Sequence, residues 1–237
     1  YLKVLVKAGY NIFISGATST GKTTFLNVLA DYIPKTERVI TIEDSAELQI
    51  HGIENLVRME VRQADGDGVS NVTLRDLIRT SLRMRPDRII VGEVRGEEAL
   101  DMIQSMNTGH DGSLSTGHAN SPQDMLSRLE TMALFASDIP IQAIRKQIAS
   151  SIDIIVQLER LRDRSRRVTA IAEVLDCTED AYILNPIFEF HEQDNLVMES
   201  SSYGDIPERV VGQLERTGYH LIHRRKLHAA ALESAEI

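Results

Sequence analysis

This chain has only one cysteine, no long apolar run and no excess of positive charge. The single cysteine, Cys177, excludes an internal disulfide framework, so we expect a reducing compartment. No stretch approaches the ~18 consecutive apolar residues that span a bilayer, and no N-terminal signal-peptide pattern is visible. The sequence therefore argues against a secreted, disulfide-stabilised domain and against a membrane-spanning helix.

Basic residues are outnumbered, because 26 Lys and Arg face 35 Asp and Glu, which gives a formal net charge of −9. Dedicated nucleic-acid binders are usually basic, so this balance argues against that class and leaves local binding of a nucleotide open. The composition, with 42% hydrophobic and 26% charged residues over 237 positions, is that of a folded protein with one large α/β domain or two small ones. Because the sequence opens at Tyr1 inside an apolar run, we expect it to be part of a longer protein.

The first half of the chain alternates between short apolar runs and amphipathic stretches, which predicts strands alternating with helices. Predicted buried strands cover residues 11–15, 39–42, 56–61 and 88–91. Predicted helices cover residues 2–6, 22–32, 73–82 and 99–106, and Thr73 with Asp76 has the spacing of a capping box. The acidic, glycine-rich stretch 64–69 is expected to be a loop. This order predicts a mainly parallel sheet covered by helices, an α/β fold.

A smaller mixed α/β module is expected after about residue 136. Ser121 followed by Pro122 predicts the start of a helix that reaches about residue 135, and Pro140 predicts the start of another through about residue 151. Strand-like segments at 152–158 and 167–175, joined by a charged turn at 162–166, predict a β-hairpin. The remaining predictions are strands at 182–190 and 196–198, and helices at 207–216 and 221–232.

A glycine-rich loop at residues 16–23, GATSTGKT, fits the pattern G-x-x-x-x-G-K-[ST] of a Walker A loop. The glycines let backbone N–H groups turn inward around a β-phosphate, and the N-terminus of the following helix adds positive potential. Lys22 would reach the β- and γ-oxygens, and the hydroxyl of Thr23 would ligate Mg²⁺. The residues expected to bind the nucleotide are Gly16, Ala17, Thr18, Ser19, Thr20, Gly21, Lys22, Thr23 and Thr24.

Carboxylates follow two of the predicted buried strands, and ligand groups cluster beyond such strand ends in open parallel sheets. Glu43 and Asp44 could approach Mg²⁺ or a water, and the alternative is that they form a solvated acidic cap on the following turn. Glu47 is expected to be exposed. Glu93 follows the predicted strand 88–91 after one glycine, at the position where a Walker B strand carries its carboxylate. There it would orient and polarise an attacking water, and the alternative is a surface glutamate.

Histidine and arginine supply further candidates. His118 ends a Gly/Ser-rich run and is either a contact of a γ-phosphate or an ordinary surface histidine. Arg58 and Arg62 alternate with apolar residues and so share one strand face. An arginine from a neighbouring subunit can stabilise a transferring phosphoryl group, and these two either serve that purpose or stay solvated. For Arg75 and Arg79 a solvated or ion-paired helix face is favoured.

These four blocks, in this order, resemble the Walker A, Asp-box, Walker B and His-box motifs of the secretion-superfamily ATPases of type II and type IV secretion and of type IV pili. The resemblance runs over residues 1–192 and is closest to the CpaF-like ATPases of tight-adherence (Flp) pilus assembly. It is carried by the segments LRMRPDRIIVGE at 82–93, MNTGHDGS at 106–113 and SRLETM at 127–132.

The resemblance implies a RecA-like P-loop NTPase domain at residues 1–192, with the core at about 1–135, helices and a hairpin at about 136–192, and a divergent, helical tail at 193–237. It implies ATP hydrolysis with Mg²⁺, with Glu43 near the attacking water, Glu93 as the Walker B glutamate and His118 facing the γ-phosphate. Arg58 or Arg62 would serve the site across a subunit interface. Family members also carry a preceding N-terminal domain, which we expect to be absent from this chain.

The partners implied by the resemblance are further copies in a homo-hexamer and an inner-membrane pilus or secretion platform protein, without nucleic acid. The location implied is cytoplasmic, peripheral at the inner face of the cytoplasmic membrane. Four alternatives use the same loop. A small-molecule kinase needs a lid, which the sequence does not suggest, and a RecA-like DNA motor is disfavoured by the acidic balance. A GTPase is weakened because Asn-Lys-x-Asp is absent. The last is a nucleotide-gated structural subunit.

Overall fold

One sheet runs through the molecule, and the computed structural model describes it over residues 1–64, 70–193 and 209–233. Within these residues nine strands lie in the order β3-β2-β4-β5-β1-β6-β7-β8-β9. The strands from β3 to β6 in this order are parallel, and β7, β8 and β9 are each antiparallel to their neighbours. Their bounds are β1 (Ile12–Gly16), β2 (Arg38–Glu43), β3 (Asn55–Glu60), β4 (Arg88–Val91), β5 (Leu114–Gly117), β6 (Ile154–Arg160), β7 (Arg166–Cys177), β8 (Tyr182–Glu192) and β9 (Gly212–Arg216).

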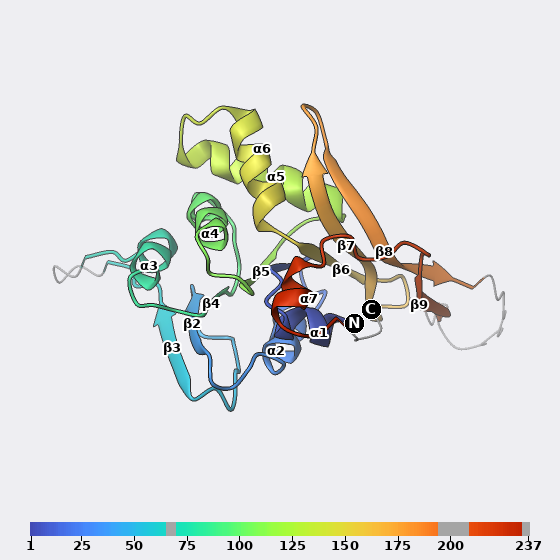
Figure 1. The fold of residues 1–237 in the computed structure, drawn as a ribbon, viewed down its shortest axis with the longest axis horizontal. Helices are drawn as coiled ribbons and strands as arrows, with labels where there is room; N and C mark the ends of the chain where they lie inside the picture. Colours follow the sequence, from blue (N-terminus) through green and yellow to red (C-terminus); the bar gives the residue numbers. More distant parts are fainter. Residues whose placement is uncertain (65–69, 194–208, 234–237) are drawn as a thin grey trace, which may run out of the picture.

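Helices cover both faces of the sheet (Figure 1). One apolar core lies under α3, α4, α5 and α6, and a second lies under α1, α2 and α7. Successive strand residues point to opposite faces, so Ile40 and Ile42 of β2 enter the first core and Val39 the second. The helices are α1 (Leu2–Lys7), α2 (Lys22–Ala30), α3 (Leu74–Ser81), α4 (Glu98–Asn107), α5 (Pro122–Ala136), α6 (Ile141–Ser151) and α7 (Arg225–Ala229).

The predicted strand–helix alternation in the first half of the chain is confirmed, and so are the helix starts predicted at Thr73 and Ser121. Thr73 and Asp76 form a capping box at the start of α3. Ser121 accepts a hydrogen bond from the backbone N–H of Asp124 at the start of α5, with Pro122 in the first turn. These local signals determine where helices begin because they satisfy backbone donors that have no partner within the helix.

The strand predicted at 56–61 is confirmed as β3, but the prediction that it is buried is wrong. Strand β3 pairs with β2 on one side and, among the described residues, with no strand on the other. Arg58 and Glu60 are exposed and Val57 and Met59 are half-buried. An alternation of apolar and polar residues is the pattern of an edge strand with one covered face.

The predicted hairpin is confirmed as β6 and β7. Of the two helices predicted in the tail, the one at 207–216 is wrong and the one at 221–232 is confirmed in part. Residues 212–216 form β9, which pairs with β8, and the helix near the C-terminus is limited to α7. The unpaired edge of β8 offers backbone partners to this segment, and pairing outweighs its helical propensity. The expected strand at 196–198 and residues 65–69 of the expected loop lie outside the described residues.

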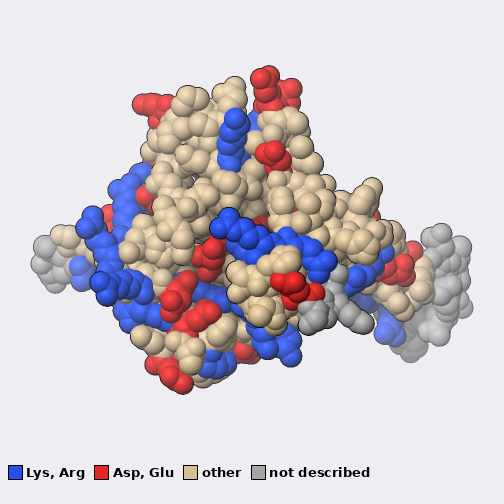
Figure 2. All heavy atoms as spheres, in the orientation of Figure 1, with Lys and Arg blue, Asp and Glu red and all other residues tan. Residues whose placement is uncertain are grey.

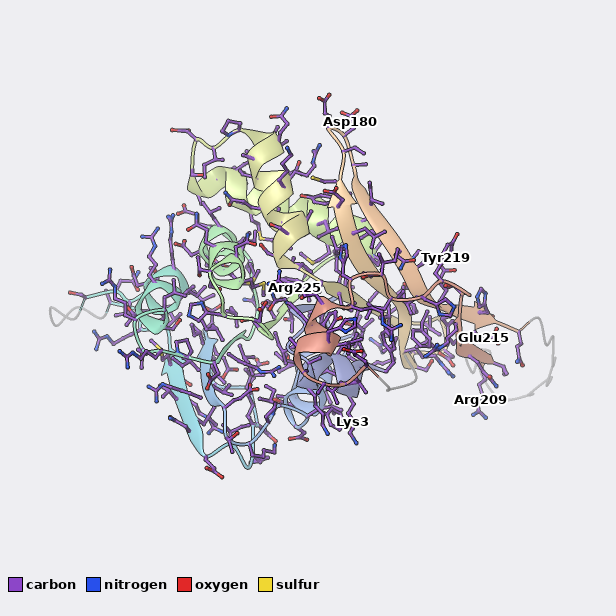
Figure 3. All side chains as sticks on the ribbon, in the orientation of Figure 1. Lys3, Asp180, Arg209, Glu215, Tyr219 and Arg225 are labelled. Carbon is purple, nitrogen blue, oxygen red and sulfur yellow. The ribbon has the colours of Figure 1, made fainter. Side chains whose placement is uncertain are left out.

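The segment from β9 to α7 is fastened to the sheet by a buried carboxylate. Figure 3 follows it from Glu215 through Tyr219 to Arg225. Glu173 of β7 is 1% exposed and accepts hydrogen bonds from the backbone N–H groups of Ile222 and His223. Leu227 of α7 is fully buried in the second core. The segment is therefore held to β7 at Ile222 and His223 and packs on the second core through α7.

Charge is unevenly spread over the surface. In Figure 2 basic side chains gather at the α3 end of the molecule, at the left of the view, while acidic side chains lie among basic ones across the middle. Among the described residues, no helix combines the length and the apolar character needed to cross a membrane.

Candidate active site at the Walker A loop

The Walker A loop joins the carboxyl end of β1 to the first turn of α2, as predicted. Gly21 precedes the helix with φ of +93°, a conformation that glycine adopts without strain. The Lys22 side chain is folded onto its own loop, where Nζ donates to Gly16 O at 2.9 Å and to Ala17 O at 3.1 Å. Burial lowers the pKa of Lys22, and the nearby Glu93 carboxylate opposes that effect. The lysine therefore lies in the loop that would cradle a phosphate.

Glu43 and Glu93 end adjacent strands, because β2 pairs with β4 through Ile42 and Val91. Glu43 is 5% exposed, and its Oε1 accepts hydrogen bonds from the backbone N–H groups of Glu47 and Leu48, each at 2.9 Å. A Cβ on the intervening Gly92 would lie 3.0 Å from Glu43 Cγ, so a glycine at this position lets the two strand ends approach closely. Oε1 of Glu43 therefore fixes the loop after β2, whereas Oε2 accepts neither of the hydrogen bonds from Glu47 and Leu48.

Glu93 is held between a histidine and an arginine. Arg95 Nε donates to Glu93 Oε2 at 2.7 Å, and this hydrogen bond raises the pKa of Arg95. The Arg95 Nη1 atom also lies 3.9 Å from Asp44 Oδ2, which links the two acidic segments. His118 Nε2 contacts Glu93 Oε1. Arg95 thus anchors Oε2 of the glutamate, while Oε1 is buried against His118.

His118 connects Glu93 to the Walker A lysine. Its Nδ1 lies 3.3 Å from Lys22 Nζ. Burial, followed by the positive charge of Lys22, lowers the pKa of His118, so its imidazole is neutral at pH 7. Lysine can only donate, so Nδ1 accepts from Lys22 and the ring hydrogen sits on Nε2 and faces Glu93. The result is a chain of contacts from Lys22 through His118 to Glu93.

Four carboxylates, with Thr23 and Arg95, border an acidic cavity of about 220 Å³ beside the Walker A loop: Glu43, Asp44, Glu47 and Glu93. Thr23 Oγ1 lines it and lies 3.4 Å from Glu47 Oε2. Carboxylate and hydroxyl oxygens are ligands that Mg²⁺ accepts, so the donor set fits this ion. No cluster of three or more metal-ligating side chains within the described residues closes around an ion by itself. The fit is therefore to a Mg²⁺ that nucleotide phosphates would help to hold.

The predicted arginines lie elsewhere. Arg58 Nη2 donates to Ile50 O at 3.0 Å. Neither Arg58 nor Arg62 is among the residues that line the acidic cavity. Arg75 and Arg79 both pair with Asp101, at 2.6 Å and 2.7 Å, which confirms the ion-paired helix face. A role of Arg58 or Arg62 towards a neighbouring subunit stays a prediction.

Two members of the site were not predicted from the sequence. Arg95 lies two residues beyond Glu93, and its position in a Gly-Glu-x-Arg segment was the available signal. Glu47 is exposed, as expected, but its carboxylate approaches Thr23 and lines the acidic cavity. Its role depends on the turn that Glu43 imposes on the chain, which no spacing rule encodes.

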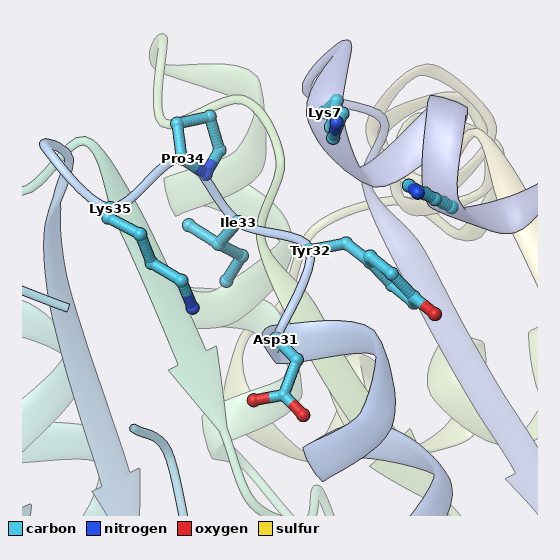
Figure 4. Close-up of a pocket in the computed structure, with 7 residues that line it drawn as sticks. Lys7, Asp31, Tyr32, Ile33, Pro34 and Lys35 are labelled. Atoms are coloured by element: carbon cyan, nitrogen blue, oxygen red, sulfur yellow. The ribbon is translucent and has the colours of Figure 1, made fainter. Parts of the chain in front are cut away.

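A second cavity, of about 530 Å³, lies beyond the other end of α2 (Figure 4). Lysines 3, 7 and 35 line it, and Lys35 Nζ donates to His51 O at 3.1 Å. Helix α2 runs from Lys22 to Ala30, so this cavity, which begins at Asp31, faces the amino ends of the parallel strands. It contains no residue of the four motifs.

Comparison with known proteins gives concordant matches. The family model described as type II/IV secretion system protein matches residues 1–201. A putative conjugal transfer protein of Mycobacterium tuberculosis is 38% identical over 168 residues, covering 71% of this chain and 47% of that protein. The type IV secretion system protein VirB11 of Bartonella quintana is 39% identical over 170 residues, covering 69% and 46%.

Among solved structures, the VirB11 ATPase of the Brucella suis type IV secretion system, in complex with sulphate, matches with a TM-score of 0.66 and 32% identity. The match covers 73% of this chain and 50% of that one. The chain thus spans about half the length of the curated relatives it matches.

Proposed function

The chain belongs to the type II/IV secretion system protein family, and from that membership and the geometry of the site we propose that it is a Mg²⁺-dependent ATPase that powers type IV secretion or pilus assembly. Its RecA-like α/β fold is that of its structural relatives. The observation that carries the proposal is the meeting of Lys22, Glu43 and Glu93 around one Walker A loop.

Lys22 would be the main phosphate ligand. Its ammonium group now lies on two neutral carbonyl oxygens, Gly16 O and Ala17 O. Phosphate oxygens carry negative charge and form stronger hydrogen bonds with a cation than carbonyls do, so a triphosphate would draw Lys22 away from them. Binding would at the same time break the contact between Lys22 and His118.

Glu93 would act on the attacking water, and His118 would position Glu93. A neutral His118, whose Nε2 contacts the carboxylate, adds no positive charge of its own. Arg95 holds the second oxygen of the same carboxylate. Orientation of water by a fixed carboxylate suits phosphoryl transfer, in which positioning and charge stabilisation dominate.

Mg²⁺ would be held by the Thr23 hydroxyl and, through water, by Glu93 together with the nucleotide. Bound there, it would neutralise charge on the phosphate oxygens. Glu47 and Asp44 line the same cavity and add negative charge around the cation site. The nucleotide-binding residues otherwise remain those of the loop from Gly16 to Thr24.

The assembled state we propose is a homo-hexamer bound peripherally at the cytoplasmic face of the inner membrane, against a platform protein. The names of the relatives, which are type IV secretion proteins, support work at such a machine. Among its branches we favour the tight-adherence pilus ATPases, on the sequence segments at 82–93 and 106–113. Arg58, on the exposed edge strand β3, is placed where a second subunit can reach it.

Substitution of two side chains tests the ATPase proposal. Glu93→Gln should bind ATP and lose at least about 100-fold in turnover, because a fixed proton-accepting group contributes about that much. Lys22→Ala should lose ATP binding. Glu97→Gln, on the exposed start of α4, is the matched control and should hydrolyse ATP as the unsubstituted chain does. Unchanged turnover in Glu93→Gln would show that this residue has no catalytic role.

A further inference from the structure

The cavity of about 530 Å³ beyond the far end of α2, called the lysine cavity from here on, gathers half of the lysines of the chain. Only six of the 237 residues are lysine, and three of them, Lys3, Lys7 and Lys35, line this cavity. The first two belong to α1 and the third follows α2, so positive charge reaches the cavity from two separate elements (Figure 4). In a chain with a net charge of −9, this is a local excess of positive charge.

Carboxylates do not neutralise these three lysines. Within residues 1–64, 70–193 and 209–233, none of the three makes an ion pair. Lys3 Nζ lies 5.4 Å from the centre of the Tyr32 ring, and Lys35 Nζ donates to the neutral carbonyl oxygen of His51 at 3.1 Å. By contrast, Lys226 is paired with two carboxylates. The charge at the lysine cavity is therefore available to a ligand.

Helix α1 carries its two lysines at an energetic disadvantage. Lys3 and Lys7 are four positions apart and so lie on one face of the helix, where like charges are destabilising. Lys3 also places a positive charge in the first turn, at the end of the helix that is itself positive. No acidic residue in α1 offsets either effect. Proteins tolerate such local conflicts mainly at functional sites, which points to a role of the two lysines in binding.

The other lining residues favour a peptide over other anionic ligands. Ile33 is 1% exposed and Tyr32 and Pro34 are half-buried, so they form an apolar floor on which an aliphatic or aromatic side chain can pack. The exposed Asp31 carboxylate can accept the backbone N–H groups that a peptide has, whereas it repels phosphate. Among the described residues, none of the exposed large apolar side chains lines the cavity, which argues against insertion into lipid.

We propose that the lysine cavity binds an acidic segment of a partner protein, in which carboxylates flank an apolar side chain. The carboxylates pair with the lysines of α1 on one side and with Lys35 on the other, and the apolar side chain packs on Ile33 and Pro34. Helix α2 begins at Lys22 of the Walker A loop and ends before the cavity, so the partner segment and a ligand of that loop bind at the same time. The proposal does not depend on the reaction at the Walker A loop.

Fluorescence anisotropy of the 237-residue chain with a labelled peptide, in which two glutamates stand on each side of a Phe-Leu pair, tests this. The dissociation constant should lie below about 100 µM, and replacing the four glutamates by glutamine should weaken binding at least about tenfold. Lys7→Gln combined with Lys35→Gln should weaken binding of the acidic peptide at least about fivefold, with the melting temperature unchanged. Lys146→Gln removes an exposed lysine of α6 and is the matched control, with unchanged binding.

Three results would overturn the proposal. The first is equal binding of the acidic and the glutamine peptide, or binding of neither. The second is displacement of the acidic peptide by Mg·pyrophosphate, or an equal loss in the Lys146→Gln control, because either would place the peptide outside the lysine cavity. The third is lysine-dependent binding of phosphatidylserine vesicles or of single-stranded DNA without binding of the peptide, because the ligand would then be a membrane or a nucleic acid.

Discussion

Replacing Glu43 separates its structural role from its charge. Its Oε1 accepts the N–H groups of Glu47 and Leu48, and Leu48 is 6% exposed. Glu43→Ala leaves both donors without their partner. Hydrogen bonds to a charged acceptor contribute about 1.5–3 kcal/mol each, and with partial rescue of the Glu47 N–H by water the loss comes to about 3 kcal/mol. For a chain of this size that is a fall in melting temperature of about 6–12 °C.

Glu43→Gln keeps an oxygen at the same place and removes the charge. It should cost about 1 kcal/mol, because both hydrogen bonds survive as neutral ones, and yet it should lower ATP turnover by at least about tenfold. Urea denaturation and a phosphate-release assay on the two variants measure these effects. Equal destabilisation by alanine and glutamine, or no destabilisation by alanine, would refute the assignment of Oε1 to the loop.

Three further predictions follow from single contacts. Turnover should stay constant as the pH is lowered to 6.5 and fall only at more acidic pH, because the pKa of His118 is lowered from its usual 6.5 and the neutral ring is required. His118→Gln should abolish this acid limb in a pH–rate profile. Arg145→Ala should lower the free energy of unfolding by about 3–5 kcal/mol in urea, because it strands the buried Glu130 carboxylate; a loss below about 1 kcal/mol would contradict this. Glu173→Leu should release the segment at 220–228, seen as faster amide hydrogen exchange there, and unchanged exchange would argue against the anchor.

The Walker A loop and the strand ends could be predicted from the sequence because their signals are local. The spacing around Lys22 and the caps at Thr73 and Ser121 depend on residues a few positions apart. Parallel strands also place their carboxyl ends at one edge, so carboxylates at 43 and 93 were expected to share it. The sequence does not show that β2 and β4 are neighbours in the sheet, because tertiary pairing sets the strand order.

The remaining features depend on contacts between distant parts of the chain. Residues 212–216 have a sequence compatible with a helix, and the free edge of β8 makes them a strand. Arg95 and Glu47 enter the site because the turns after β4 and β2 carry them there. Glu173, about fifty positions earlier in the chain, holds the backbone at Ile222 and His223, a few residues before the buried Leu227. Local propensity contains no information on such partners.

The most direct test of the account is a crystal structure of the chain with Mg²⁺ and an ATP analogue that resists hydrolysis. The account predicts the β- and γ-phosphates within about 3 Å of Lys22 Nζ, with that amine released from Gly16 O and Ala17 O and the terminal phosphate facing Glu93. A triphosphate bound elsewhere, or bound while Lys22 stays on those two carbonyls, would contradict it.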